Sequence, residues 1–250
     1  MYNDIFTIGS FTVHGYGLMI AIGVVAALII GDKRAASKGL DGDFIYPLTA
    51  WTVILGFIAA KVLFIITNFR EFLADPKGFI TGSGFVVFGG IIGGILTIFG
   101  YSRIKKKDPV AYLDLMVPCV AIAQGFGRIG CLLAGCCYGR ETDSPLGIIF
   151  RHSHYAPNDV KLIPTQIIMS VGNFIIATIL LIYARKERSK GKVGCLYIML
   201  YSFGRFFVEF LRNDYRGNVG IFSTSQFIGM IMFALSTLVF FLLPFKKKEA

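Results

Sequence analysis

The chain has 250 residues, of which 55% are hydrophobic and 16% charged, and its mean hydropathy is +0.67. Soluble domains carry about 25% charged residues, so this composition excludes a disordered chain and disfavours an ordinary soluble enzyme. The net charge of +10 does not indicate nucleic-acid binding, because 15 of the 25 lysines and arginines lie in clusters between or after apolar runs. Such clusters are typical of cytoplasmic loops in membrane proteins.

Seven apolar runs follow one another along the chain, and each is long enough to form a membrane-spanning helix. We predict an all-α membrane protein with seven transmembrane helices, because backbone groups in lipid must be hydrogen-bonded within the segment. The whole chain, residues 1–250, is expected to form a single integral membrane domain. The predicted spans are 11–31, 46–67, 84–102, 109–127, 162–184, 193–211 and 219–245.

The basic clusters predict the orientation of these spans. They follow the first, third, fifth and seventh runs, at residues 33–38, 103–107, 185–192 and 246–248. Because lysine and arginine accumulate on the cytoplasmic side, the N-terminus is expected outside the cytoplasm and the C-terminus inside. The two longest connections, 68–83 and 128–161, then lie on the outer side, where we expect the functional site.

Four charged residues fall within or at the end of predicted spans, where charges are costly. The predicted topology places Lys61, Arg128, Arg205 and Glu209 in one layer of the outer leaflet, together with Tyr16 of the first span. The four charges sum to +2, which favours binding of an anion such as a phospholipid phosphate. The structural alternative is a salt bridge between Arg205 and Glu209 with snorkelling cations.

A segment rich in glycine and cysteine follows the fourth span, and residues 125–140 read GFGRIGCLLAGCCYGR. This segment resembles the signature of bacterial prolipoprotein diacylglyceryl transferases, which has the same frame of glycines and arginines. The matching positions are Gly127, Arg128, Gly130, Gly135, Gly139 and Arg140.

Further positions along the chain resemble motifs of the same family, and the resemblance covers nearly all 250 residues. They are Tyr16-Gly17-Leu18, Gly89-Gly90 in the third span, Pro164-Thr165-Gln166, the Arg205, Glu209 and Arg212 triplet on one helix face, and Ser225-Gln226. The chain departs from the family pattern at several positions: Phe88 replaces a histidine, Cys131 and Ala134 replace two asparagines, Cys136 replaces a glutamate and Lys61 replaces an arginine.

The resemblance implies transfer of a diacylglyceryl group from phosphatidylglycerol to the lipobox cysteine in the signal peptide of a preprolipoprotein. The expected location is the lipid bilayer of a bacterial cytoplasmic membrane, with the active site facing the outer leaflet. Arg128, Arg205, Tyr16 and Glu209 are then the candidate catalytic residues, and neither a metal nor an organic cofactor is expected. The candidate substrate-binding residues are Lys61, Gly89, Gly90, Gly127, Gly130, Cys131, Gly135, Cys136, Gly139, Arg140, Gln166, Arg212 and Gln226.

Two other functions fit parts of the sequence. A diverged paralogue would use the same phospholipid site but another acceptor, and a transporter would place its ion site nearer the midplane of the membrane. The spacing of Cys131, Cys136 and Cys137 does not match a zinc motif. These thiols are expected to pack, to form a local disulfide, to tune the site or to react.

Overall fold

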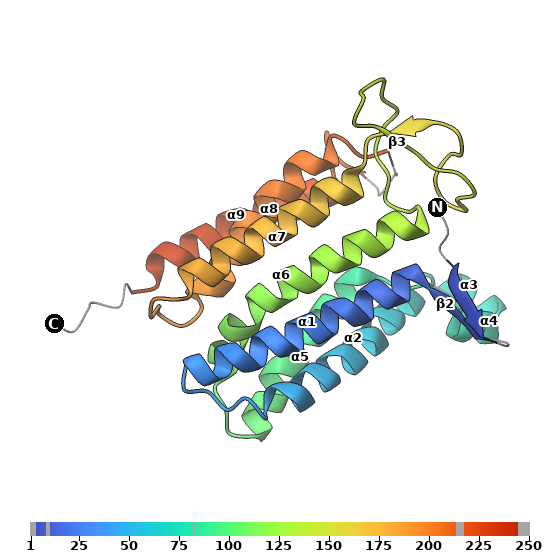
Figure 1. Cartoon of the computed structure of the whole chain (residues 1–250). Coiled ribbons are helices and arrows are strands. Elements are labelled where there is room, and N and C mark those ends of the chain that lie inside the picture. The colour runs from blue at the N-terminus through green and yellow to red at the C-terminus, as the bar shows by residue number, and fades with distance from the viewer. Residues whose placement is uncertain (1–3, 9–10, 83, 214–217, 245–250) are drawn as a thin grey trace. The chain divides into compact units, whose positions relative to one another are not determined.

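The computed structural model describes residues 4–8, 11–82, 84–213 and 218–244, and within them helices dominate (Figure 1). The long helices are α1 (Gly15–Ser37), α2 (Ile45–Thr67), α5 (Val87–Ile104), α6 (Pro109–Ala134), α7 (Thr165–Tyr183), α8 (Lys192–Glu209) and α9 (Thr224–Leu242). Two short helices, α3 (Phe69–Ala74) and α4 (Pro76–Thr81), lie between α2 and α5.

Within the described residues, six helices are long and apolar enough to cross a membrane: α1, α2, α5, α6, α7 and α9. The prediction of a mostly helical chain with several membrane-spanning helices is therefore confirmed. Helix α8 is not among the six, and it carries three charged residues, Lys192, Arg205 and Glu209. The seventh span and the orientation of the termini stay predictions.

In the part of the chain that the structure describes, three two-stranded antiparallel sheets interrupt the helical pattern, which the expectation of an all-α protein did not include. They pair β1 (Asp4–Ile8) with β2 (Phe11–His14), β3 (Ile148–Ile149) with β4 (Lys161–Leu162), and β5 (Asn218–Val219) with β6 (Phe222–Ser223). Helices α1 and α9 begin at Gly15 and Thr224, whereas the predicted first and last spans begin at residues 11 and 219. A hydropathy window cannot separate a short apolar strand from the helix that follows it.

Helix α6 continues to Ala134, seven residues beyond the predicted end of the fourth span at residue 127. The glycines at 125, 127 and 130 do not break this helix. Arg128 and Cys131 therefore lie on the last turns of α6 rather than in a loop.

The chain divides into two compact units, residues 31–113 and residues 1–30 with 114–250. In the first unit, α2 and α5 pack against each other through glycine. A Cβ atom added to Gly89 would lie 2.4 Å from the backbone oxygen of Ala59, and one added to Gly93 would lie 2.4 Å from the Ala59 Cβ. The helices approach this closely only because both positions lack a side chain.

In the second unit, α6 contacts three helices that position the candidate site. Gly23 of α1 lies against the backbone of Ala123. On α7, Ser170 donates a hydrogen bond of 2.9 Å to the carbonyl oxygen of Gly125. On α8, Tyr197 donates a hydrogen bond of 2.7 Å to the Gln124 side chain.

Helices α7, α8 and α9 lie side by side, as Figure 1 shows. The Asp114 carboxylate of α6 accepts hydrogen bonds of 2.7 and 2.8 Å from the backbone N–H groups of Gly191 and Gly194. Asp114 thus satisfies free donors at the N-terminus of α8 and fixes that end against α6.

Candidate active site at the end of α6

The turn that ends α6 brings two cysteines together. The N–H of Cys136 donates to the carbonyl oxygen of Cys131 at 3.1 Å, and the N–H of Gly135 donates to that of Leu132 at 3.2 Å. Gly135 has a left-handed backbone, with φ of +73°. These features define a Schellman motif, in which the side chains at the positions of Cys131 and Cys136 commonly touch. The spacing of the two cysteines around Gly135 therefore has a structural cause.

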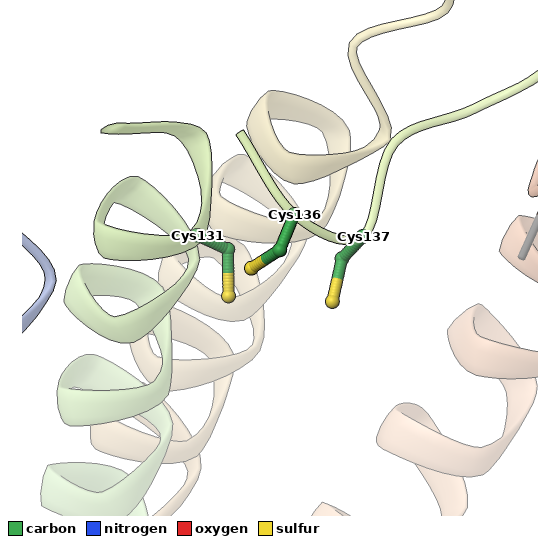
Figure 2. A group of neighbouring side chains, drawn as sticks. All are labelled: Cys131, Cys136 and Cys137. Atoms are coloured by element: carbon green, nitrogen blue, oxygen red, sulfur yellow. The ribbon is translucent and has the colours of Figure 1, made fainter. Parts of the chain in front are cut away.

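The thiol of Cys137 lies close to those of Cys131 and Cys136. Cys137 is one of the few described non-glycine residues with a left-handed backbone, with φ of 60°. The carbonyl oxygens of Cys136 and Cys137 are held by Gln166 Nε2 at 2.8 Å and by Thr165 Oγ1 at 2.7 Å. The three sulfur atoms lie within 4.8 Å of one another, and Figure 2 shows the side chains projecting to the same side.

None of the three cysteines forms a disulfide within the described part of the chain, so the local disulfide that the sequence left open is not present there. The spacing of the three cysteines along the chain does not match a zinc motif, and it does not show that the turn at Gly135 brings them together. A glycine four residues after Cys131, at the end of a helical pattern, is the signal that could have predicted the approach of Cys131 and Cys136.

The segment that follows the cysteines passes between two other parts of the chain. Gly139 and Arg140 donate backbone hydrogen bonds to the carbonyl oxygens of Ile163 and Leu211, at 3.1 and 2.9 Å. A Cβ on Gly139 would lie 2.6 Å from the Ile163 oxygen and 2.8 Å from the Leu211 oxygen. Glycine is therefore required here, and the segment ties the end of α8 to the start of α7.

Two arginines surround the thiols. Arg128, on α6 one turn before Cys131, lies within electrostatic reach of Cys131, Cys137 and Arg212. Arg212 is 5% exposed, and its guanidinium lies against the Cys137 thiol. Hydrogen bonds with Cys131 and Cys136 lower the pKa of the Cys137 thiol, and Arg212 lowers it further. Hydrogen bonds with Cys131 and Cys137 raise the pKa of the Cys136 thiol.

Arg205 and Glu209 form a buried ion pair on α8. Their Nη1 and Oε2 atoms are 2.5 Å apart, and the side chains are 11% and 9% exposed. This geometry agrees with the i, i+4 pairing that the sequence allowed. Each charge is compensated by the other, so the pair adds no net charge to the site.

Tyr16 of α1 lies beside α6. A Cβ on Gly130 would lie 3.1 Å from the Tyr16 ring, so this glycine makes room for the tyrosine. Tyr16 is within electrostatic reach of Cys131, Cys136 and Arg128. At Gly127, by contrast, an added Cβ would meet no atom within 4 Å, which leaves open space beside α6.

Several predicted site residues have other partners in the structure. Gln226 forms a capping box with Ser223 at the start of α9, with hydrogen bonds of 3.1 and 3.2 Å, and it also donates to the Phe206 carbonyl oxygen. Lys61 donates to the carbonyl oxygens of Gly82 and Gly84 at 2.8 and 3.2 Å. Gly89 and Gly90 belong to the α2–α5 contact. Lys61, Gly89 and Gly90 lie in the unit of residues 31–113.

Gln166 and Gln226 differ in their side-chain carbonyl oxygens, because among the described residues that of Gln226 accepts a hydrogen bond and that of Gln166 does not. Gln166 is 1% exposed, and while its Nε2 holds the Cys136 carbonyl, its Oε1 accepts no hydrogen bond within the described part of the chain. Sequence reasoning missed Met169, whose sulfur lies 3.8 Å from Arg212 Nη1, and Thr165 as an anchor of Cys137. No local sequence signal connects these residues with the site.

The fold and the site define a class of protein: a helical membrane protein with arginines and polar groups gathered at the end of a long helix, here α6. A family model described as prolipoprotein diacylglyceryl transferase matches residues 3–242. The chain belongs to this family, as the sequence resemblance predicted.

Several relatives named phosphatidylglycerol–prolipoprotein diacylglyceryl transferase are similar over most of their length. One from Clostridium tetani is 43% identical over 245 residues, covering 98% of both chains. Another from Clostridium perfringens, designated 2, is 47% identical over 222 residues, covering 88% of this chain and 87% of the relative. A protein designated 1 from the same organism is 35% identical over 238 residues.

Proposed function

We propose that this chain transfers a diacylglyceryl group from phosphatidylglycerol to the lipobox cysteine thiol of a preprolipoprotein, the first step of lipoprotein maturation. Membership of the transferase family and the names of its relatives support this function. The chain keeps the family's glycine and arginine frame from Gly127 to Arg140 and its Arg205, Glu209 and Arg212 triplet.

The observation that carries the proposal is Arg128. Within the described part of the chain, its guanidinium has no ion pair and no hydrogen bond, although the residue is partly buried at the thiol-lined end of α6. A partly buried guanidinium that forms no ion pair favours an anionic ligand. A phosphodiester is the anion that phosphatidylglycerol supplies, and the guanidinium can bind two of its oxygens.

The reaction needs a phosphate that leaves and a thiol that attacks. The acceptor sulfur forms a bond to the glyceryl carbon while the carbon–oxygen bond to phosphate breaks, and glycerol phosphate leaves with the electron pair. Arg128 stabilises the charge that grows on the phosphate. Glu209 and Tyr16 are our candidates for the thiol proton. Glu209 must loosen its contact with Arg205 to accept the proton, because a paired carboxylate is a weak base.

We further propose that the chain spans a bacterial cytoplasmic membrane seven times, with α8 as the additional span. The N-terminus is placed outside and the active site faces the outer leaflet, where the signal peptide of the acceptor also lies. The basic clusters after every second span support this orientation. A membrane-impermeant thiol reagent added from outside should label Ser144→Cys but not Ser189→Cys, and the reverse result would contradict the orientation.

Complementation tests the function directly. A bacterial strain depleted of its own transferase should grow when this chain is supplied, and mass spectrometry should find diacylglyceryl on the cysteine of a reporter lipoprotein. Arg128→Ala, produced in the same amount in the membrane, should fail in both tests. Growth without lipid on the reporter, or lipid on another acceptor, would contradict the proposal and favour a diverged paralogue.

A further inference from the structure

The cysteine cluster has a property that diacylglyceryl transfer does not by itself require. Three thiols from one short segment meet at a single point, within 4.8 Å of one another. In a tetrahedral zinc site with Zn–S bonds of about 2.3 Å, two sulfurs are separated by about 3.8 Å. The widest sulfur–sulfur separation in the cluster therefore exceeds this value by about 1 Å at most.

We propose that Cys131, Cys136 and Cys137 form a three-thiolate site for a thiophilic divalent cation, best matched by Zn²⁺. Thiolates are soft ligands and select such an ion over Mg²⁺ or Ca²⁺. Among the described histidine, cysteine and carboxylate side chains, no fourth ligand joins the cluster. Three protein ligands with an open fourth position are the pattern of a catalytic zinc site rather than a structural one.

The backbone around the cluster is built to hold the ligands. The Schellman turn fixes Cys131 against Cys136, and the carbonyl oxygens of Cys136 and Cys137 are each anchored by a side chain of α7. These contacts restrain the ligands, as hydrogen bonds around metal ligands commonly do. The left-handed backbone of Cys137 is a further local cost that a binding function would explain.

The charges around the cluster also suit a metal ion. Zn²⁺ with three thiolates carries one negative charge, and the nearby guanidiniums of Arg128 and Arg212 carry two positive charges. The bound site would therefore be stabilised by its surroundings, with one positive charge left for a phosphate. Both arginines lie in the same compact unit as the cysteines.

The fourth position would take the acceptor thiol, and this part rests on the proposed function. On binding the metal, the acceptor thiol would pass its proton to Glu209, the acceptor proposed above, or to water, and would become a metal-held thiolate. Its sulfur then attacks the glyceryl carbon, the carbon–oxygen bond to phosphate breaks, and glycerol phosphate leaves with the electron pair. The thioether product is a weaker ligand than a thiolate and dissociates. No electron acceptor or donor is needed.

Metal binding is tested on the full-length chain in detergent, with Zn²⁺ and then Co²⁺ as the probe. We expect about one Zn²⁺ per chain and, with Co²⁺, a sulfur-to-metal charge-transfer band. Both signals should be lost in Cys131→Ser, Cys136→Ser and Cys137→Ser but kept in the control Cys195→Ser. Absence of binding, or binding that survives all three substitutions, would overturn the site.

A second measurement does not depend on the folding of variants. In the unaltered chain, Zn²⁺ should protect three of the five cysteines from alkylation, and a chelator should remove this protection. Equal alkylation with and without Zn²⁺, or a disulfide among the three cysteines in protein taken from native membranes, would overturn the proposal.

The role of the fourth position is tested separately. A lipobox peptide should change the Co²⁺ spectrum, whereas the same peptide with serine in place of cysteine should not. Transfer activity that persists in metal-free protein would overturn this role and leave the proposed function standing. Metal binding without any transfer to the peptide would instead contradict the proposed function.

Discussion

The two compact units use glycine and polar residues in opposite ways. In residues 31–113, glycines remove side chains so that α2 and α5 touch, and Lys61 of α2 donates to the carbonyl oxygens of Gly82 and Gly84. In the other unit, Gly135 and Gly139 shape a backbone that gathers thiols between two arginines. Glycines that match family motifs therefore have different physical roles in the two units. Their contacts in the structure, and not the motifs, distinguish packing residues from site residues.

The largest effect is expected at Arg128. Arg128→Lys keeps the charge but loses the planar pair of donors, so diacylglyceryl transfer to a lipobox peptide should fall by about 100-fold or more. The thermal midpoint should change little, because the guanidinium makes no hydrogen bond within the described residues.

Arg185→Lys is the matched control for this substitution, because Arg185 is exposed after α7. Its transfer rate should stay within about twofold of the unaltered chain. Equal rates in the Arg128 and Arg185 variants would remove Arg128 from the phosphate site and weaken the contrast between the units.

A smaller effect, on stability rather than catalysis, is expected in the α2–α5 contact. Gly89→Ala forces a methyl group to 2.4 Å from the Ala59 oxygen, and such overpacking costs about 1–3 kcal/mol. Thermal unfolding in detergent should show a lower midpoint. Gly100→Ala, on the same helix with no atom within 4 Å of the new Cβ, should leave the midpoint nearly unchanged.

If Gly89→Ala instead left stability intact and reduced only substrate binding, Gly89 would belong to the active site as the sequence resemblance implied. Measuring KM and the unfolding midpoint of the same preparation separates these two roles.

The smallest effect is expected for Gln226. Gln226→Ala removes the reciprocal bond of the capping box and the contact with Phe206, which should cost about 0.5–1.5 kcal/mol of stability. Transfer per folded molecule should change less than twofold.

Gln166→Leu should show the opposite pattern, with slower transfer, because Gln166 anchors the Cys136 carbonyl. A strong catalytic defect in Gln226→Ala would return this residue to the substrate site.

Much of the helical framework could be predicted from hydropathy, because long apolar runs satisfy their backbone hydrogen bonds most simply as helices. The boundaries were less predictable. The extension of α6 to Ala134 was missed because glycines at 125, 127 and 130 look like helix breakers, whereas here they accommodate Phe174 and Tyr16 or face open space. Such reasons lie in neighbouring helices and not in the local sequence.

The candidate site was predictable in part for the same reason. Arg205 and Glu209 share a helix face, so their pairing followed from their spacing. The capping box of Gln226 was also readable, from the Ser223-x-x-Gln226 pattern. By contrast, the bonds from Lys61 to Gly82 and Gly84 and from Gln166 to Cys136 join residues that are 21 to 30 positions apart, and no local pattern encodes them.

In the proposed reaction, the acceptor's thiol receives the lipid and the site's own thiols do not. Intact-mass spectrometry of the purified chain, incubated with phosphatidylglycerol with and without a lipobox peptide, tests it directly. We predict a diacylglyceryl mass increase on the peptide cysteine and none on the chain. A stable lipid adduct mapped to Cys131 or Cys136, formed without peptide, would contradict the account.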